Sequence, residues 1–222
     1  MSACPALPRY GLYALTPDNP ADTSQLLARV LAAIAGGVTL VQYRDKPATV
    51  AMRETRARAL VMACHLRGVP LIVNDDISLA AEAGAAGVHL GRDDGDLRAA
   101  RALLGEARII GVSCYDSLAL AREAVAAGAD YVAFGSFYAS ATKPKAVRCP
   151  IDLLRQASQE LAVPIVAIGG ITAENAQPLL AAGASLLAVI GALFDGPDTT
   201  AAARAFAMAL AHSPSLNNRK SP

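Results

Sequence analysis

The sequence predicts a single (β/α)₈ barrel. Short apolar segments alternate with longer, alanine-rich amphipathic segments along most of the chain, and turn residues separate them. Eight apolar segments can be recognised, each followed by a helical stretch, which is the pattern of a closed parallel barrel. The 222 residues are enough for one barrel of ordinary size, and no composition change marks a domain boundary.

The expected strands are continuous apolar runs, which indicates a parallel sheet buried on both faces. They are 10–16, 38–44, 69–74, 87–90, 108–113, 129–135, 163–169 and 185–191. Ala-Gly pairs precede several of them, because Gly adopts the left-handed conformation that closes a helix. The expected helices are 23–35, 48–67, 77–84, 95–104, 116–127, 150–161, 172–182 and 197–211. Residues 1–212 then form the barrel, and the polar segment 213–222 is expected to be a disordered tail.

Composition excludes several classes of function. Twenty basic residues against 19 acidic ones give a net charge of +1, so no electrostatic footprint for nucleic acid or an anionic membrane is present. No apolar run approaches the ~18 residues that span a bilayer, and the first ten residues do not resemble a signal peptide. We therefore expect a cytoplasmic protein with four reduced cysteines. Whether it forms a homo-oligomer stays open.

The catalytic end of such a barrel is formed by the C-terminal ends of its strands. After the second strand, alternation sends Gln42, Arg44 and Lys46 to one side and Tyr43 and Asp45 to the other. An amide, a guanidinium and an ammonium group suit a polyphosphate attached to a hydrogen-bonding ring. A solvated basic loop is an equally good interpretation of these residues alone.

Carboxylates follow the third and fourth strands. Asn74-Asp75-Asp76 ends one, and a segment with Asp93 and Asp94 follows the other. Acids at neighbouring strand ends can share one Mg²⁺, which prefers a few carboxylates, water and substrate phosphates. Some of them can instead cap the next helices. Asp76 and Asp93 are the better caps and Asp75 and Asp94 the better ligands, although spacing alone does not separate them.

The fifth strand places a hydroxyl, Ser113, at the same end, where a turn or helix cap is the simpler interpretation. No histidine or aspartate stands beside it in the sequence as an activating base. His65 in a helix and His212 near the C-terminus are poor catalytic candidates. His89 lies inside a strand, where a hydrogen-bonded barrel residue is more common than a ligand.

The last three strands end in groups suited to phosphate. The long segment 135–145 carries hydroxyls and two lysines, as a phosphate clamp or lid would. Gly170 and Gly191 stand at the ends of strands seven and eight, where barrels commonly bind phosphate through backbone N–H groups, although tight turns also require glycine. Two anion sites facing each other indicate a condensation of two phosphorylated small molecules.

An ordered set of motifs resembles the thiamine phosphate synthase family over residues 10 to 211. The motifs are Gln-x-Arg-x-Lys (42–46), Asn-Asp-Asp (74–76), Gly-Val-His-Leu-Gly-x-x-Asp (87–94), Gly-Val-Ser (111–113), Gly-Ala-Asp-Tyr-Val with a following Thr-Lys (128–143), and Ala-Ile-Gly-Gly-Ile (167–171). The resemblance implies a Mg²⁺-dependent transfer. Diphosphate leaves a hydroxymethylpyrimidine first, and the nitrogen of a thiazole phosphate captures the carbocation.

The resemblance also implies roles by position. The pyrimidine diphosphate would contact Gln42, Arg44, Lys46, Asn74 and Ser113. Mg²⁺ would bind Asp75 and Asp94, and Lys143 would neutralise the departing diphosphate beside Arg44, so that Arg44, Lys143 and Ser113 form the catalytic set. The thiazole phosphate would lie among Ser140, Thr142, Gly170, Ile190 and Gly191.

Three positions depart from the family pattern. Arg92 replaces a usual Gln, Ser140 a usual Thr and Gly191 a common Ser, changes that we expect to tune affinity. A thiazole tautomerase of the same fold is the closest rival, but it would not need the complete diphosphate and metal set. A sugar-phosphate isomerase would need a paired acid and base, and a binding or sensor protein would not need to retain these charged residues.

Overall fold

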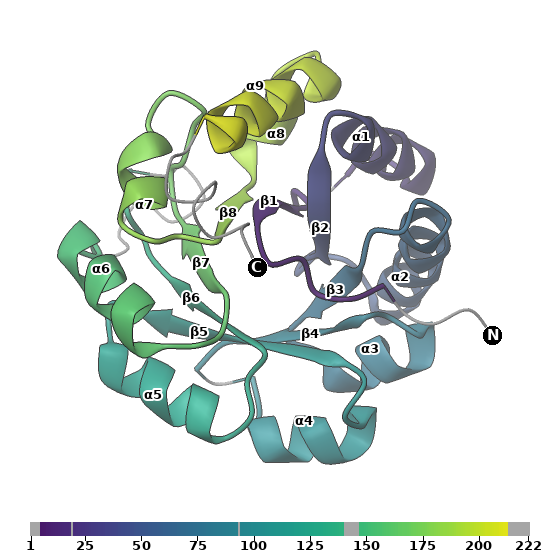
Figure 1. The fold of residues 1–222 in the computed structure, drawn as a ribbon. Coiled ribbons are helices and arrows are strands. Elements are labelled where there is room, and N and C mark those ends of the chain that lie inside the picture. The colour runs from purple at the N-terminus through teal and green to yellow at the C-terminus, as the bar shows by residue number, and fades with distance from the viewer. Residues whose placement is uncertain (1–4, 19, 93, 140–146, 213–222) are drawn as a thin grey trace.

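A computed structural model describes residues 5–18, 20–92, 94–139 and 147–212. Eight parallel strands pair in sequence order, and β1 also pairs with β8, so the sheet closes into a barrel (Figure 1). The strands are β1 (Gly11–Leu15), β2 (Val38–Tyr43), β3 (Leu71–Asn74), β4 (Gly87–Leu90), β5 (Ile109–Tyr115), β6 (Tyr131–Phe134), β7 (Ile165–Ile168) and β8 (Leu186–Val189). The predicted (β/α)₈ barrel is confirmed.

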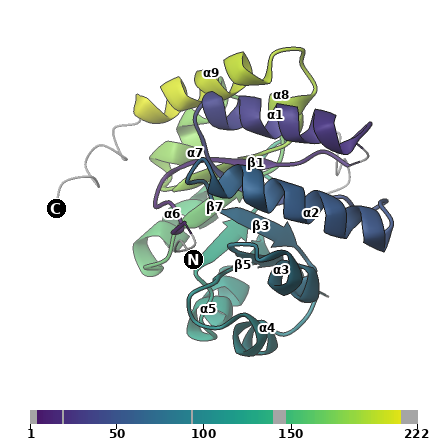
Figure 2. The same cartoon turned by 90° about the vertical axis from the view of Figure 1, so that its right-hand side faces the viewer.

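Helices surround the barrel, and α9 packs against α1 to close the ring (Figures 1 and 2). They are α1 (Thr23–Ala35), α2 (Val50–His65), α3 (Ile77–Ala83), α4 (Leu97–Leu104), α5 (Leu118–Ala126), α6 (Ile151–Glu160), α7 (Gln177–Ala181), α8 (Gly191–Phe194) and α9 (Thr199–Ala211). In the part of the chain that the structure describes, none of these helices is long and apolar enough to cross a membrane. The tail predicted over 213–222 lies outside the described residues.

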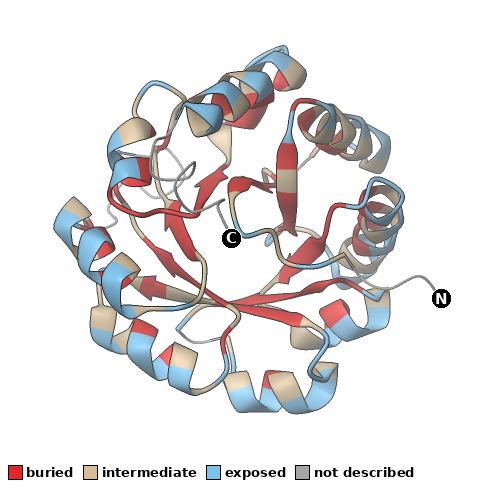
Figure 3. Ribbon diagram, viewed as in Figure 1, coloured by how far each residue is buried: buried red, intermediate tan, exposed pale blue. Residues whose placement is uncertain are grey.

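Apolar side chains of the strands form two layers, and most strand residues are buried (Figure 3). One layer fills the barrel and includes Tyr13, Leu40 and Tyr131, and the other lies between strands and helices and includes Leu12 and Tyr43. Alternation along a strand sends successive side chains to opposite layers. Burial on both faces is the reason that the strands have continuous apolar sequences.

Several predicted boundaries differ from the structure by about two residues, and the start of α7 differs most. The helix expected over 172–182 begins only at Gln177, because Thr172 and Asn175 form a side-chain-stabilised turn. The Asn175 Oδ1 accepts from the Thr172 amide at 2.9 Å, and its Nδ2 donates to the Gly170 carbonyl at 3.0 Å. Such local bonds compete with helical ones. The strand expected over 185–191 ends at Val189, and the short helix α8 follows at once.

Helix caps explain most other boundaries. The Asp76 carboxylate accepts from the Leu79 amide at 2.9 Å and caps α3, as predicted. Thr49 caps α2, so this helix begins at residue 50 rather than 48. Asp96 caps α4, which therefore begins two residues later than expected. Asp93, the predicted cap, lies outside the described residues.

Glycine at position 87 is required by a close approach of two strands. A Cβ atom on Gly87 would lie 1.8 Å from the carbonyl oxygen of Ile109, its partner on β5. We expect Gly87→Ala to lower the free energy of unfolding by about 3 kcal/mol, the upper end of overpacking costs, because backbone cannot move aside as a side chain can. Urea unfolding measures this. Gly196→Ala is the matched control, since nothing lies within 4 Å of its Cβ position. Equal stability of the two variants would contradict the expectation.

The cysteines behave as buried apolar side chains. Cys64, Cys114 and Cys149 are free and buried. Burial raises the pKa of each thiol to about 12, so all three are protonated at neutral pH. The expectation of reduced thiols holds for these three, and Cys4 lies outside the described residues.

Candidate active site

A cavity of about 880 Å³ opens at the C-terminal ends of the strands. It is lined by residues that follow strands on all sides of the barrel, and polar side chains dominate the part formed by β2 to β5. A smaller cavity of about 330 Å³ at the other end has Arg9 as its one charged lining residue among the described residues. The larger cavity is therefore the candidate active site on the grounds of volume, position and polar lining. We call it the mouth cavity.

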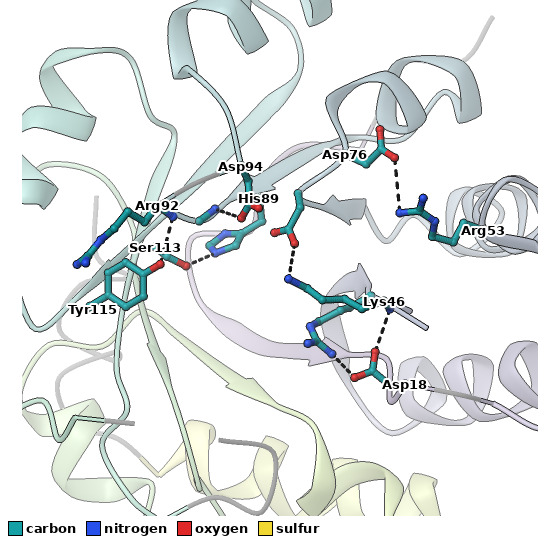
Figure 4. Close-up of polar contacts among 12 residues, drawn as sticks. Asp18, Lys46, Arg53, Asp76, His89, Arg92, Asp94, Ser113 and Tyr115 are labelled. Carbon is teal, nitrogen blue, oxygen red and sulfur yellow. Dashed lines mark hydrogen bonds and ion pairs between the residues drawn. The ribbon is translucent and has the colours of Figure 1, made fainter. Parts of the chain in front are cut away.

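The loops after β1 and β2 fix the basic groups of the mouth cavity. The Thr16 hydroxyl donates to the Arg44 carbonyl at 2.8 Å and accepts from the Arg44 amide at 2.9 Å. The Asp18 carboxylate forms an ion pair with the Arg44 guanidinium and accepts from the Lys46 amide at 3.1 Å (Figure 4). Asp18 thus holds the Arg44 guanidinium and the backbone of Lys46 in place before any ligand binds.

Alternation after β2 is as predicted. Gln42, Arg44 and Lys46 line the mouth cavity. Tyr43 and Asp45 point to the helix side, where the Asp45 carboxylate pairs with the Arg56 guanidinium of α2. Both charged side chains are almost fully buried, so this pair anchors the segment that carries Arg44. The interpretation as a solvated basic loop is wrong for Gln42 and Arg44, which are largely buried, whereas the Lys46 side chain is 57% exposed.

Two carboxylates from neighbouring strand ends face each other. Asp75 follows β3 and adopts a φ of 66°, a backbone conformation that a non-glycine residue rarely adopts. The Asp75 carboxylate contacts the Lys46 ammonium at 2.8 Å. Asp94 accepts from the Gly91 amide at 2.9 Å and lies within hydrogen-bonding reach of Asp75. Asp76 points away toward Arg53 of α2 (Figure 4), which separates the cap from the candidate ligands.

The two carboxyl groups titrate differently. Burial, and then the neighbouring Asp75 carboxylate, raise the pKa of Asp94 above its ordinary value. Burial alone would also raise the pKa of Asp75. Hydrogen bonds from the Lys46 ammonium and from Asp94 outweigh that effect, and the pKa of Asp75 is lowered. Two adjacent carboxylates that share one positive charge are a suitable environment for a divalent cation.

A chain of hydrogen bonds crosses the barrel beneath the cavity. The Gln42 Nε2 donates to the Tyr13 hydroxyl at 2.7 Å, and the hydroxyls of Tyr13 and Tyr131 are 2.8 Å apart. His89 contacts the Tyr131 hydroxyl through Nδ1 at 3.0 Å. Its Nε2 lies 2.8 Å from Ser113 Oγ (Figure 4). Ser113 lies within β5, so its interpretation as a turn or helix cap is wrong.

The ends of β6 to β8 form the opposite wall. Gly170, Ile190 and Gly191 line the mouth cavity, as predicted. A Cβ atom on Gly170 would lie 2.1 Å from the carbonyl oxygen of Ala139, so this glycine permits the segment after β6 to lie against it. A Cβ atom on Gly191 would lie 2.4 Å from Asp195 Oδ2, and the Ser common at this position would require Asp195 to move.

The remaining predicted residues divide into two groups. Asn74 and Arg92 line the mouth cavity. The Arg92 guanidinium lies 4.9 Å from the ring centre of Tyr115, a cation–π arrangement at the rim. The predicted lid residues Ser140, Thr142 and Lys143 lie outside the described residues.

Several site residues escaped sequence reasoning. Asp18 follows the first strand, so the same rule of strand ends that found Arg44 could have found it. Tyr13 and Tyr131 stand at inward positions of strands, which alternation could have indicated. The sequence places no histidine near Ser113, but pairing of β4 with β5 brings His89 to it. No local signal predicts that contact.

Comparison with known proteins decides the family. The family model described as thiamine monophosphate synthase matches residues 12–193. The chain belongs to this family. A thiamine-phosphate synthase of Thiobacillus denitrificans is 61% identical over 193 residues, covering 87% of this chain and 91% of that protein. One of Thioalkalivibrio sulfidiphilus is 52% identical over 197 residues, covering 89% and 93%. The chain is therefore an enzyme, a transferase of the thiamine monophosphate synthase family.

Solved structures agree with the fold. Thiamine phosphate pyrophosphorylase from Pyrococcus furiosus superposes with a TM-score of 0.80 at 28% identity, covering 91% of this chain and 96% of that one. A 3-hexulose-6-phosphate synthase from Salmonella typhimurium superposes with a TM-score of 0.69 at 19% identity, covering 90% and 98%. The second likeness concerns the barrel alone, since one fold supports many reactions.

Proposed function

We propose that this enzyme joins hydroxymethylpyrimidine diphosphate to hydroxyethylthiazole phosphate, giving thiamine phosphate and diphosphate. The observation that carries the proposal is the charge arrangement of the mouth cavity. Arg44, Lys46 and the Asp75–Asp94 pair gather on the β2–β4 side, and glycines line the β7–β8 side. One side suits a diphosphate and the other a monophosphate, so two phosphorylated substrates can be held facing each other.

The proposed reaction is dissociative. The bond between the pyrimidine CH₂ carbon and the diphosphate oxygen breaks, and its electron pair leaves with the diphosphate. The lone pair of the thiazole nitrogen then forms the new C–N bond to that carbon. Arg44 and Lys46 offset the charge that develops on the leaving group, and Lys143 is proposed to join them. A neutral ring nitrogen needs no catalytic base.

Asp75 and Asp94 are the residues proposed to hold Mg²⁺. A bound Mg²⁺ would add positive charge beside the diphosphate. Among the described residues, no group of three acidic, histidine or cysteine side chains gathers as a metal site. Water and substrate phosphates would therefore complete the coordination, which suits Mg²⁺.

The test combines the purified protein, both substrates and Mg²⁺, and measures thiamine phosphate after oxidation to its fluorescent derivative. We expect product that disappears when a chelator is added and returns with excess Mg²⁺. Isomerisation of the thiazole phosphate without product would instead establish a tautomerase. Binding of both substrates without any reaction would identify a binding protein and overturn the proposal.

Mg²⁺ binding should depend on pH through Asp94. A proton competes with Mg²⁺ for the Asp94 carboxylate. Because the pKa of Asp94 is raised, this competition begins at a higher pH than for an ordinary aspartate. We expect the half-saturating Mg²⁺ concentration to rise as the pH falls toward the raised pKa of Asp94. Asp94→Asn should remove this pH dependence and weaken Mg²⁺ binding by at least about tenfold. Titration of activity with Mg²⁺ at several pH values measures both effects, and an unchanged pH profile in Asp94→Asn would refute the assignment.

A further inference from the structure

The hydrogen-bond chain beneath the mouth cavity joins two residues that line this cavity and that the family resemblance implies for the pyrimidine. Gln42 stands at one end and Ser113 at the other, and the side chains between them come from β1, β6 and β4. Tyr13 and Tyr131 are 1% and 0% exposed, so these hydroxyls cannot exchange their partners for bulk water. Their orientations must be mutually consistent.

With Gln42 Nε2 as the donor to Tyr13, counting protons gives one consistent direction for the bonds that follow. Burial is the main cause that raises the pKa of both phenols well above the ordinary value, so each keeps a single proton. Tyr13 accepts from Gln42 and therefore donates to Tyr131. Tyr131 then donates to Nδ1 of His89, whose Nε2 carries the proton that is donated to Ser113 Oγ. The Ser113 proton is left for a ligand in the cavity.

The Gln42 amide orientation that starts this chain leaves half of the amide for the cavity. One Nε2–H is bound to Tyr13. Oε1 and the second Nε2–H remain for the cavity that Gln42 lines. An aminopyrimidine presents an amino donor beside a ring-nitrogen acceptor, which is complementary to that pair. An oxo analogue presents a carbonyl acceptor beside a ring N–H donor, so it requires the amide to be reversed.

If the Gln42 amide were reversed, every donor and acceptor along the hydrogen-bond chain would have to exchange roles. Oε1 would face Tyr13, both phenol protons would have to turn, and His89 would have to carry its proton on Nδ1. The Ser113 hydroxyl would then donate to His89 instead of to the ligand. Binding an oxo ring therefore leaves the ligand without the serine donor.

We propose that Tyr13, Tyr131 and His89 are positioning residues that orient the Gln42 amide and the Ser113 hydroxyl, so that the pocket selects an amino-substituted pyrimidine over its oxo analogue. This inference rests on the proposed function for the identity of the ring. A second observation concerns the space that the barrel leaves for the Tyr131 ring of this hydrogen-bond chain. Position 111 has to be glycine, because a Cβ atom there would lie 1.9 Å from Cζ of Tyr131.

The experiment compares two ligands, the aminopyrimidine diphosphate and its oxo analogue, by calorimetry without the thiazole substrate. We expect Tyr13→Phe and Tyr131→Phe each to lower the ratio of the two affinities by about tenfold, the effect of one buried hydrogen bond. Each variant removes a single oxygen atom and retains the ring. Tyr43→Phe is the matched control, because Tyr43 is a buried tyrosine of β2 on the helix side, and its ratio should equal that of the wild type.

The outcomes separate this inference from the proposed function. If the wild type makes thiamine phosphate but both variants keep the wild-type ratio, the positioning role is overturned and the function stands. If the wild type makes no product yet prefers the amino ligand, and the variants lose that preference, the function fails and the positioning role stands. A wild type that binds both ligands equally would overturn the inference directly.

Discussion

Replacing Arg44 by alanine should lower kcat/KM for the pyrimidine diphosphate by about 10²- to 10³-fold. Truncating one partner of a hydrogen-bonded charge pair costs about 2–5 kcal/mol, and each 1.4 kcal/mol is about tenfold. The loss has two sources. The diphosphate loses a guanidinium, and the Asp18 carboxylate that was paired with it becomes a repulsive charge in the same cavity. Steady-state kinetics with varied pyrimidine diphosphate measures the effect.

A double variant separates these two sources. Arg44→Ala with Asp18→Asn should recover about tenfold of the lost kcat/KM, because the repulsive charge is removed. Arg122→Ala is the control, since Arg122 pairs with Glu160 between α5 and α6, away from the mouth cavity. A double variant no more active than Arg44→Ala would show that Asp18 does not oppose the ligand. Full activity of Arg44→Ala would place the diphosphate elsewhere.

The second large effect concerns stability. Asp45→Asn should lower the free energy of unfolding by about 3–5 kcal/mol, because it leaves the Arg56 guanidinium buried without its counter-charge. The Asp45 side chain is 0% exposed and that of Arg56 only 4%. Urea unfolding monitored by circular dichroism measures the loss.

Two comparisons make the Asp45 result interpretable. Replacing both partners, as Asp45→Leu with Arg56→Met, should restore much of the stability, since no charge is then buried. Arg155→Met breaks an exposed ion pair with Asp152 and should cost at most a few tenths of a kcal/mol. If Asp45→Asn were as stable as Arg155→Met, the buried pair would not anchor the segment after β2.

The order of strands and helices could be predicted because it depends on local pattern. Eight apolar runs separated by amphipathic stretches leave few other ways to bury two faces of a sheet. Boundaries were less accurate where side chains bond to nearby backbone. The Thr172–Asn175 turn delays α7, and Asp96 rather than Asp93 caps α4. These choices depend on small differences between competing hydrogen bonds, which composition does not resolve.

The barrel, the polar residues at its strand ends and the side of β2 on which Arg44 lies can be predicted from sequence pattern alone. These follow from periods of two and 3.6 residues, which are properties of neighbouring positions. The pair of Asp18 with Arg44, the approach of Asp75 to Asp94 and the contact of His89 with Ser113 are seen only in the folded barrel. Those contacts join different strands, and their geometry depends on the register and closure of the barrel, which no local pattern records.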